Sequence, residues 1–170
     1  DRKGRVLAVD RPSFDVEVHY SVISGSWAYS QAARDARREE GEEWTKLGDF
    51  ARDALVREYL PARVNELEAM WEGLSLLSGV SRDELDERRT RIVERTQRLA
   101  SSVWEKRRLQ RLREWSESRD RSLEPPTLAD VSRPIREQAA PHVVLRGVSD
   151  SAAFEMRKLA SSYPDLLRII

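Results

Sequence analysis

The sequence predicts a mainly α-helical protein with a minor β part, an α+β fold, and three observations support this prediction. Residues 82–118 contain no Gly or Pro, residues 14–22 alternate apolar and polar side chains, and residues 142–146 form a second β-like run. The first observation predicts one long helix and the other two predict strands. We therefore expect an N-terminal β-hairpin, a helical hairpin with one long charged helix at about 82–118, and a small C-terminal strand–helix unit.

The N-terminal hairpin is predicted from two short segments. The apolar positions of the first are Phe14, Val16, Val18, Tyr20 and Val22. This period of two is typical of a strand with one buried face. Residues 5–9 are a second candidate strand, joined to it through residues 10–13, where Pro12 and its neighbours favour a turn. A lone hairpin is marginally stable, so it must pack on helices or pair with a further strand such as 142–146.

Three helical segments are predicted between the hairpin and the long helix. Residues 27–40 are rich in Ala and Arg, and residues 44–60 place apolar side chains at spacings of three and four. Pro61 would cost about 3 kcal/mol inside a helix, so we predict a kink or a restart there. Residues 62–77 continue the amphipathic pattern and end before Gly79.

The long helix has a defined start and a narrow apolar seam. Ser81 and Glu84 have the spacing of a capping box, and residues 82–118 would extend roughly 55 Å at ~1.5 Å per residue. The predicted interaction seam consists of Leu85, Ile92, Leu99, Val103 and Leu112. A seam flanked by charged faces needs a partner, which is residues 62–77 folded back, the same helix of a second subunit, or both.

A polar loop at residues 118–126 is the predicted boundary between two regions. Residues 1–120 hold the hairpin and the coiled-coil-like helices, and residues 127–170 form a small C-terminal α/β segment that we expect to pack on the same domain. In this segment we predict a short helix at 127–131, a strand at 142–146, and a helix at 151–161 that Asp150 caps and Pro164 ends.

The composition excludes several classes of function. Thirty basic and thirty acidic residues cancel, so no overall field attracts nucleic acid or an anionic membrane, and any such preference must be local. Without Cys there is no disulfide or thiolate nucleophile, and the cytoplasm is the default compartment. No apolar run reaches the roughly 20 residues of a transmembrane helix. Because the sequence begins at Asp1, we expect it to be part of a larger protein.

The densest basic run lies near the end of the long helix. It contains Lys106, Arg107, Arg108, Arg111 and Arg113, and Trp104 and Trp115 flank it. Basic helices with aromatic residues bind nucleic acid or anionic lipid. Three glutamates interrupt the run, however, and residues 34–72 carry an excess of acid, so ion pairing within or between subunits is the expected role.

Two groups of residues are candidates for chemistry. Asp15, Glu17 and His19 project from one strand face at ~7 Å intervals, so two of them can share a metal with a ligand from elsewhere. Only two His occur in the chain, and we expect this face simply to be solvated.

Arg136 and His142 form the second group. Their separation is similar to the Arg–(four to six residues)–His pattern of the HEPN ribonuclease family, in which the pair acts on an RNA phosphodiester. The sequence departs from that family because Pro141 precedes His142 and residues 143–145 predict a strand, whereas the family's pair lies on a helix. A histidine at the surface or at the edge of the core is the alternative.

The expected function is a non-enzymatic protein–protein interaction or assembly module that self-associates through the long helix, as a homo-oligomer or with another protein. We expect no cofactor and no metal. Nucleic-acid binding through residues 106–113 is an alternative. A hydrolase or ribonuclease-like domain, centred on His142 or on the Asp15, Glu17 and His19 face, is a second alternative.

Overall fold

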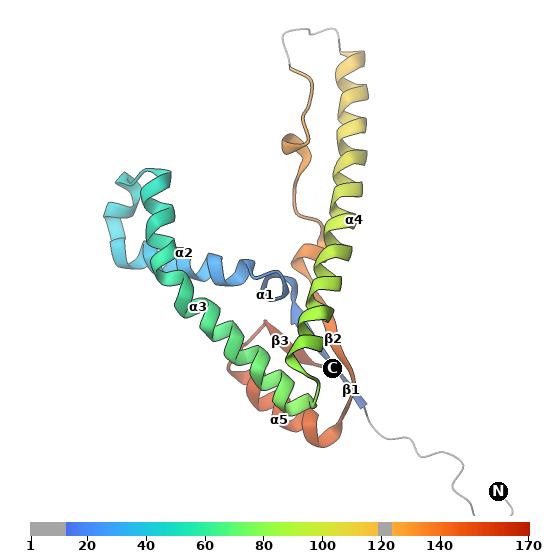
Figure 1. The fold of residues 1–170 in the computed structure, drawn as a ribbon. Coiled ribbons are helices and arrows are strands. Elements are labelled where there is room, and N and C mark those ends of the chain that lie inside the picture. The colour runs from blue at the N-terminus through green and yellow to red at the C-terminus, as the bar shows by residue number, and fades with distance from the viewer. Residues whose placement is uncertain (1–12, 119–123) are drawn as a thin grey trace, which may run out of the picture.

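A computed structural model of the chain describes residues 13–118 and 124–170 (Figure 1). It confirms a mainly helical fold with a small three-stranded antiparallel sheet. The elements are β1 (Ser13–His19), α1 (Tyr20–Ile23), α2 (Ser26–Glu40), the 3-10 helix η1 (Gly41–Lys46), α3 (Asp49–Ser78), α4 (Arg82–Glu117), the 3-10 helices η2 (Ala129–Val131) and η3 (Arg136–Ala139), β2 (Pro141–Ser149), α5 (Asp150–Ser161) and β3 (Leu167–Ile169).

The sheet has the order β2-β1-β3, with β1 in the centre. Val18 pairs with His142 on one side and with Leu167 on the other, so the expected pairing with the 142–146 strand is confirmed. The other predicted partner, residues 5–9, lies outside the described residues. β3 was not predicted, because a strand of three residues is too short to show an alternating pattern.

The predicted strand at 14–22 ends earlier than expected. β1 stops at His19, and Tyr20–Ile23 form the short helix α1 instead. The His19 side chain accepts a hydrogen bond from the Ser21 N–H and so caps this helix. Tyr20, Val22 and Ile23 are all buried in this helical conformation. A helical turn therefore buries the same apolar side chains that suggested a longer strand.

Helices α2 and α3 form an arm at one side of the sheet (Figure 1). The predicted helix at 44–60 begins only at Asp49, because Gly48 is extended and η1 occupies the preceding residues. Of the kink or restart predicted at Pro61, the restart is wrong, because α3 is one helix across it, and the kink stays a prediction. Before Pro61, Val56 packs against α2, and after Pro61, Leu67 packs in the main core. Tertiary packing on both sides of the proline therefore holds the helix together.

The long helix α4 begins and ends as predicted. The Ser81 hydroxyl accepts a hydrogen bond from the Glu84 N–H at 3.2 Å, which is one half of the predicted capping box. Gly79 takes a left-handed conformation with φ 70°, and the turn there joins α3 and α4 into a hairpin. Figure 1 shows the two helices diverging from this turn, with the second half of α4 extending beyond the sheet.

The C-terminal region adds β2 and α5 to the same sheet. The predicted helix at 127–131 is only the single 3-10 turn η2, and the predicted strand at 142–146 is extended to 141–149. Ser149, not Asp150, caps α5, since its hydroxyl accepts from the Ala152 N–H while Asp150 is already helical. Met156 and Ala153 on α5 are fully buried against the core.

The main core lies where α3, α4, α5 and the sheet meet. Its largest fully buried side chains are Trp71, Met70, Leu74, Leu85 and Met156. The Arg89 guanidinium of α4 lies over the Trp71 ring of α3, 4.6 Å from its centroid, so a cation–π contact joins the two helices above the core.

An ion-pair network around the buried Asp35 joins α2 to α3. Asp35 is 9% exposed, and its carboxylate accepts hydrogen bonds from Arg63 Nε at 2.6 Å and from Arg38 Nη2 at 2.7 Å. Arg63 also donates to Glu66 at 2.7 Å. The hydrogen bond from Arg63 holds the pKa of Asp35 below its ordinary value.

This network predicts a pH-dependent contribution to stability. The pKa of Asp35 is lower in the folded than in the unfolded chain, so its stabilisation is present above the unfolded value, about 3.9, and is lost as pH falls through the folded value. Asp35→Asn should lower the free energy of unfolding by about 1–3 kcal/mol at pH 7. Urea denaturation should show this difference shrinking below about pH 4; an equal difference at both pH values would contradict the assignment.

Candidate functional site

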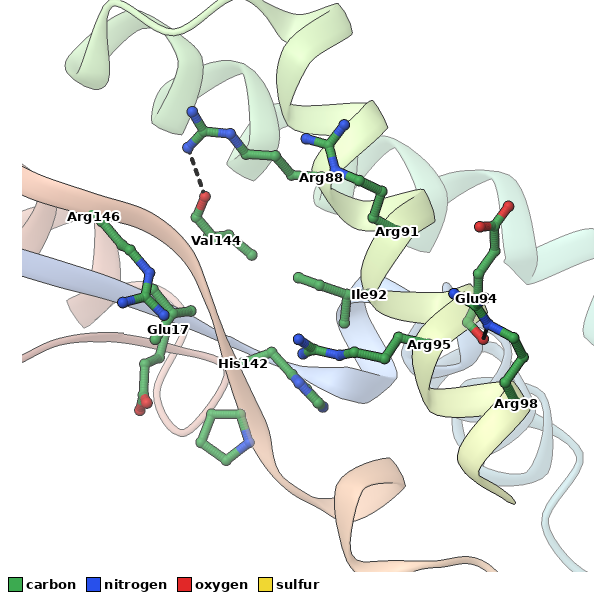
Figure 2. Close-up of a pocket in the computed structure, with 12 residues that line it drawn as sticks. Glu17, Arg88, Arg91, Ile92, Glu94, Arg95, Arg98, His142, Val144 and Arg146 are labelled. Atoms are coloured by element: carbon green, nitrogen blue, oxygen red, sulfur yellow. Dashed lines mark hydrogen bonds between the residues drawn. The ribbon is translucent and has the colours of Figure 1, made fainter. Parts of the chain in front are cut away.

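An open cleft of about 800 Å³ lies between α4 and β2 (Figure 2). Five arginines line it, namely Arg88, Arg91, Arg95, Arg98 and Arg146. Only two acidic side chains, Glu17 and Glu94, line it as well. We call this feature the arginine cleft. In a chain of zero net charge, it concentrates positive charge in one concave surface.

Regular secondary structure places these side chains. The four arginines of α4 are spaced by three or four residues, which puts them on one side of the helix. The opposite wall is β2, where His142 pairs with Val18 of β1 and Arg146 lies in the irregularity between the Leu145 and Val148 pairs. Ile92 of α4 and Val144 of β2 are buried between the two walls and hold them together.

Arg88 fastens α4 to the sheet. Its Nη1 donates to the carbonyl oxygen of Val144 at 2.9 Å, and its Nη2 donates to the Glu84 carboxylate of the preceding turn. Most of the hydrogen-bonding capacity of Arg88 is therefore used within the protein. Arg91 pairs with Glu87 at 3.3 Å, but both side chains are well exposed, so this pair is weak.

Arg95 and Arg146 have no such partners. Within residues 13–118 and 124–170, neither guanidinium makes a hydrogen bond or an ion pair. Figure 2 shows Arg95 extending from α4 toward His142. Arg146 lies on the opposite wall, near Glu17. The Glu94 carboxylate points to the other side of α4. Two guanidinium groups that make no hydrogen bond or ion pair with a described residue thus line one cleft from two different elements.

His142 lies at the edge of this space. Its Nε2 is 2.8 Å from the Glu137 carbonyl oxygen and donates to it, and its ring is tilted against Tyr20 with the centroids 5.6 Å apart. Arg136, the other half of the HEPN-like pair, lies in η3 and is not among the described residues that line the cleft. His142 stands in strand β2, in agreement with the expected departure from that family's helix.

The Asp15, Glu17 and His19 face is engaged in local hydrogen bonds. Asp15 Oδ1 accepts from the Gly147 N–H at 3.2 Å, and both ring nitrogens of His19 lie within hydrogen-bond distance of neighbours. The pairing of β1 with β2 shifts between Phe14 and Glu17, which disturbs the regular spacing of this face. Among the residues that the structure describes, no group of three or more His, Asp or Glu could hold a metal ion.

The predicted seam of α4 is divided. Leu85 and Ile92 are 1% and 8% exposed and belong to the main core, whereas Leu99 is 42% exposed. Val103 and Leu112 are half-buried. The buried face continues instead through Thr96 and Ala100, two small residues that a search for large apolar side chains passes over.

The basic run 106–113 is divided between sides of the helix. Arg108 makes a forked pair with Glu105 at 2.8 and 3.0 Å, and Arg107 donates to the Arg133 carbonyl oxygen at 3.3 Å. Arg111 lines a smaller cleft against η2. The side chains of Lys106 and Arg113 are exposed and make no hydrogen bond or ion pair with another described residue.

The arginine cleft was not predicted from the sequence. Residues 88–98 hold five arginines in eleven positions, a lower density than the five cations in eight positions of the run 106–113. A signal was present in the helical spacing of Arg88, Arg91, Arg95 and Arg98, but the wall formed by β2 becomes apparent only from the fold.

A comparison of the chain with protein-family models, curated proteins and solved structures found no match in any of the three. Among the described residues, no helix has the length and apolar character needed to cross a membrane.

Proposed function

We propose that the chain is a non-enzymatic nucleic-acid-binding module that contacts phosphate groups through the arginine cleft. The observation that carries this proposal is the pair Arg95 and Arg146, which face the same space from α4 and β2 without a carboxylate partner among the described residues. A bound anion would be attracted to the several cations that line this cleft.

The chemistry of the cleft fits phosphate. A guanidinium presents a planar fork of donors that matches phosphate oxygens, and arginine is the usual choice where such oxygens are bound in pairs. The cleft is concave and open, so it accepts a chain of phosphates along α4, not only one enclosed group. This arrangement favours the phosphate backbone of a nucleic acid.

Binding without catalysis is the simpler proposal. His142 is the cleft's histidine, and its Nε2 already donates to a backbone carbonyl. The described lining residues include no Ser, Thr or Tyr hydroxyl that could act as a nucleophile. In the ribonuclease-like alternative Arg136 and His142 would act together, but Arg136 is not among the described residues that line the cleft, which supports a binding role over hydrolysis.

Replacing one cleft arginine tests the proposal. At about 50 mM salt, wild-type protein should bind a fluorescein-labelled 20-base-pair DNA duplex, and Arg95→Ala should weaken binding about tenfold because one phosphate contact is lost. Arg37→Ala is the matched control, since Arg37 is exposed on α2 and does not line the cleft. Fluorescence anisotropy measures both. No binding by the wild type, or equal losses in the two variants, would reject the proposal.

Assembly through α4 is the second candidate. Leu99 and Leu109 are 42% and 47% exposed, at the middle and in the second half of α4, which favours a contact there. Leu85 and Ile92 already have partners in the same chain, which shortens the seam that a second subunit could use. Sedimentation of Leu99→Asp beside the wild type tests this candidate: an unchanged mass rejects the seam.

A further inference from the structure

The arginines of the cleft continue as one line of cations along α4. Its members are Arg88, Arg91, Arg95, Arg98, Lys106 and Arg113, and we call this line the basic stripe. At about 100° per residue these positions fall within about 80° of one another around the helix axis. From Arg88 to Arg113 the stripe extends roughly 37 Å at ~1.5 Å per residue.

The stripe is the open side of α4. Its members from Arg91 onward are exposed, whereas the core takes up the face of Leu85, Ile92 and Ala100. The chain returning from the end of α4 lies along another side, where the Trp104 Nε1 donates to the Arg133 carbonyl oxygen at 2.8 Å. A ligand can therefore lie against the whole length of the stripe.

Carboxylates neutralise only the start of the stripe, where Glu84 pairs with Arg88 and Glu87 pairs weakly with Arg91. Between Arg88 and Arg113 no acidic residue occupies the same sector of the helix, and Glu94 and Glu105 lie at its edge. Glu105 is already held by the forked pair with Arg108. The hydrogen bonds from Arg108 lower the pKa of Glu105, so that charge is already paired with a cation outside the stripe.

From this geometry, and resting on the proposed function, we infer that the ligand is a nucleic-acid duplex of about one helical turn, bound along the basic stripe without regard to base sequence. The length of the stripe is close to the roughly 34 Å of one turn of duplex. Contacts to phosphates fix the position of a duplex but carry no sequence information.

The surroundings favour a duplex over a single strand. Proteins that bind single strands without sequence preference stack bases on aromatic side chains. None of the described residues that line the arginine cleft is Phe, Tyr or Trp. Trp104, the nearest tryptophan of the basic run, is engaged with the returning chain on another side of α4.

The shape also favours a duplex over an anionic membrane. A flat lipid surface would reach the exposed cations of α4 but not the opposite wall of a cleft, where Arg146 lies. A backbone ridge can enter the cleft and contact Arg95 and Arg146 together. Helices that bind membrane surfaces also place many large apolar side chains beside their cations, whereas Leu99 and Leu109 are the exposed large apolar side chains of α4.

Duplex length gives the experiment. Anisotropy at about 50 mM salt compares labelled DNA duplexes of 8 and 16 base pairs, a 16-base-pair RNA duplex, and a 16-nucleotide single strand. The wild type should bind the 16-base-pair DNA at least about tenfold more tightly than the 8-base-pair DNA. Lys106→Ala/Arg113→Ala should remove this advantage and leave the 8-base-pair affinity within about twofold. Arg34→Ala/Arg37→Ala on α2 is the matched control and should keep the advantage.

The outcomes separate the two proposals. Tighter binding of the longer DNA or RNA duplex, lost only in the Lys106 and Arg113 variant, supports the stripe and tells which backbone it prefers. Binding in the cleft with no length advantage, or equal binding of the single strand, overturns the stripe while the proposed function stands. Binding of phosphatidylserine vesicles but of neither nucleic acid overturns both proposals.

Discussion

Reversing two charges in the arginine cleft should weaken duplex binding by about 100-fold or more at 50 mM salt. The change is Arg95→Glu/Arg146→Glu. It removes two phosphate contacts and also places two carboxylates where the phosphates would lie, so repulsion is added to the lost attraction. Neither side chain has a partner among the described residues, so the substitutions break no contact there and should leave the free energy of unfolding almost unchanged.

The control for this variant has the same net charge. Arg34→Glu/Arg37→Glu changes two exposed arginines of α2, which do not line the cleft. It should lower affinity only a few-fold, through the long-range field, which salt screens. If the two double variants bind equally poorly, the overall charge of the protein governs binding, and the cleft has no special role.

Trp71→Ala should be the most damaging single substitution in the core. The Trp71 side chain is fully buried at the junction of α3, α4 and the sheet. Removing such a side chain costs about 3–5 kcal/mol, because it leaves a cavity and abolishes the contact with Arg89. Urea denaturation, followed by circular dichroism, measures this loss.

Trp71→Phe distinguishes packing from polar contacts. The buried Trp71 Nε1 has no hydrogen-bond partner among the described residues, so phenylalanine removes an unsatisfied donor while it keeps most of the apolar volume. Its loss of stability should be well below that of alanine. An equal loss in the two variants would mean that the indole N–H has a partner that the contacts around Trp71 do not show.

Local signals predicted the long elements because those signals are strong. For α4, the Ser81 cap and the absence of Gly and Pro over 36 residues fix both the start and the length. At Pro61 the local signal failed, because packing on both sides outweighs one missing hydrogen bond. At Tyr20–Ile23 the apolar pattern suited both a strand and a helical turn, and the His19 cap decided between them.

The candidate site depends on contacts that are distant in sequence. Arg95 and Arg146 line one cleft only because β2 pairs with β1 and Arg88 ties α4 to Val144. The sequence shows one wall of the cleft as a helical spacing of arginines, but nothing local indicates the other wall. Leu85 and Ile92 show that a local pattern can also mislead. They form part of a seam that suggested contact with a second subunit, but the core of the same chain covers them.

The dependence of duplex affinity on salt tests the central claim most directly. For the wild type, the logarithm of the association constant for a 20-base-pair DNA should fall linearly with the logarithm of salt concentration, with a slope of about −5 for roughly six phosphate contacts. Arg95→Ala/Arg146→Ala should make this slope less steep by about 2, since two contacts are lost. A wild-type slope near zero, or the same slope in both proteins, would contradict the assignment of the arginine cleft as a phosphate-binding site.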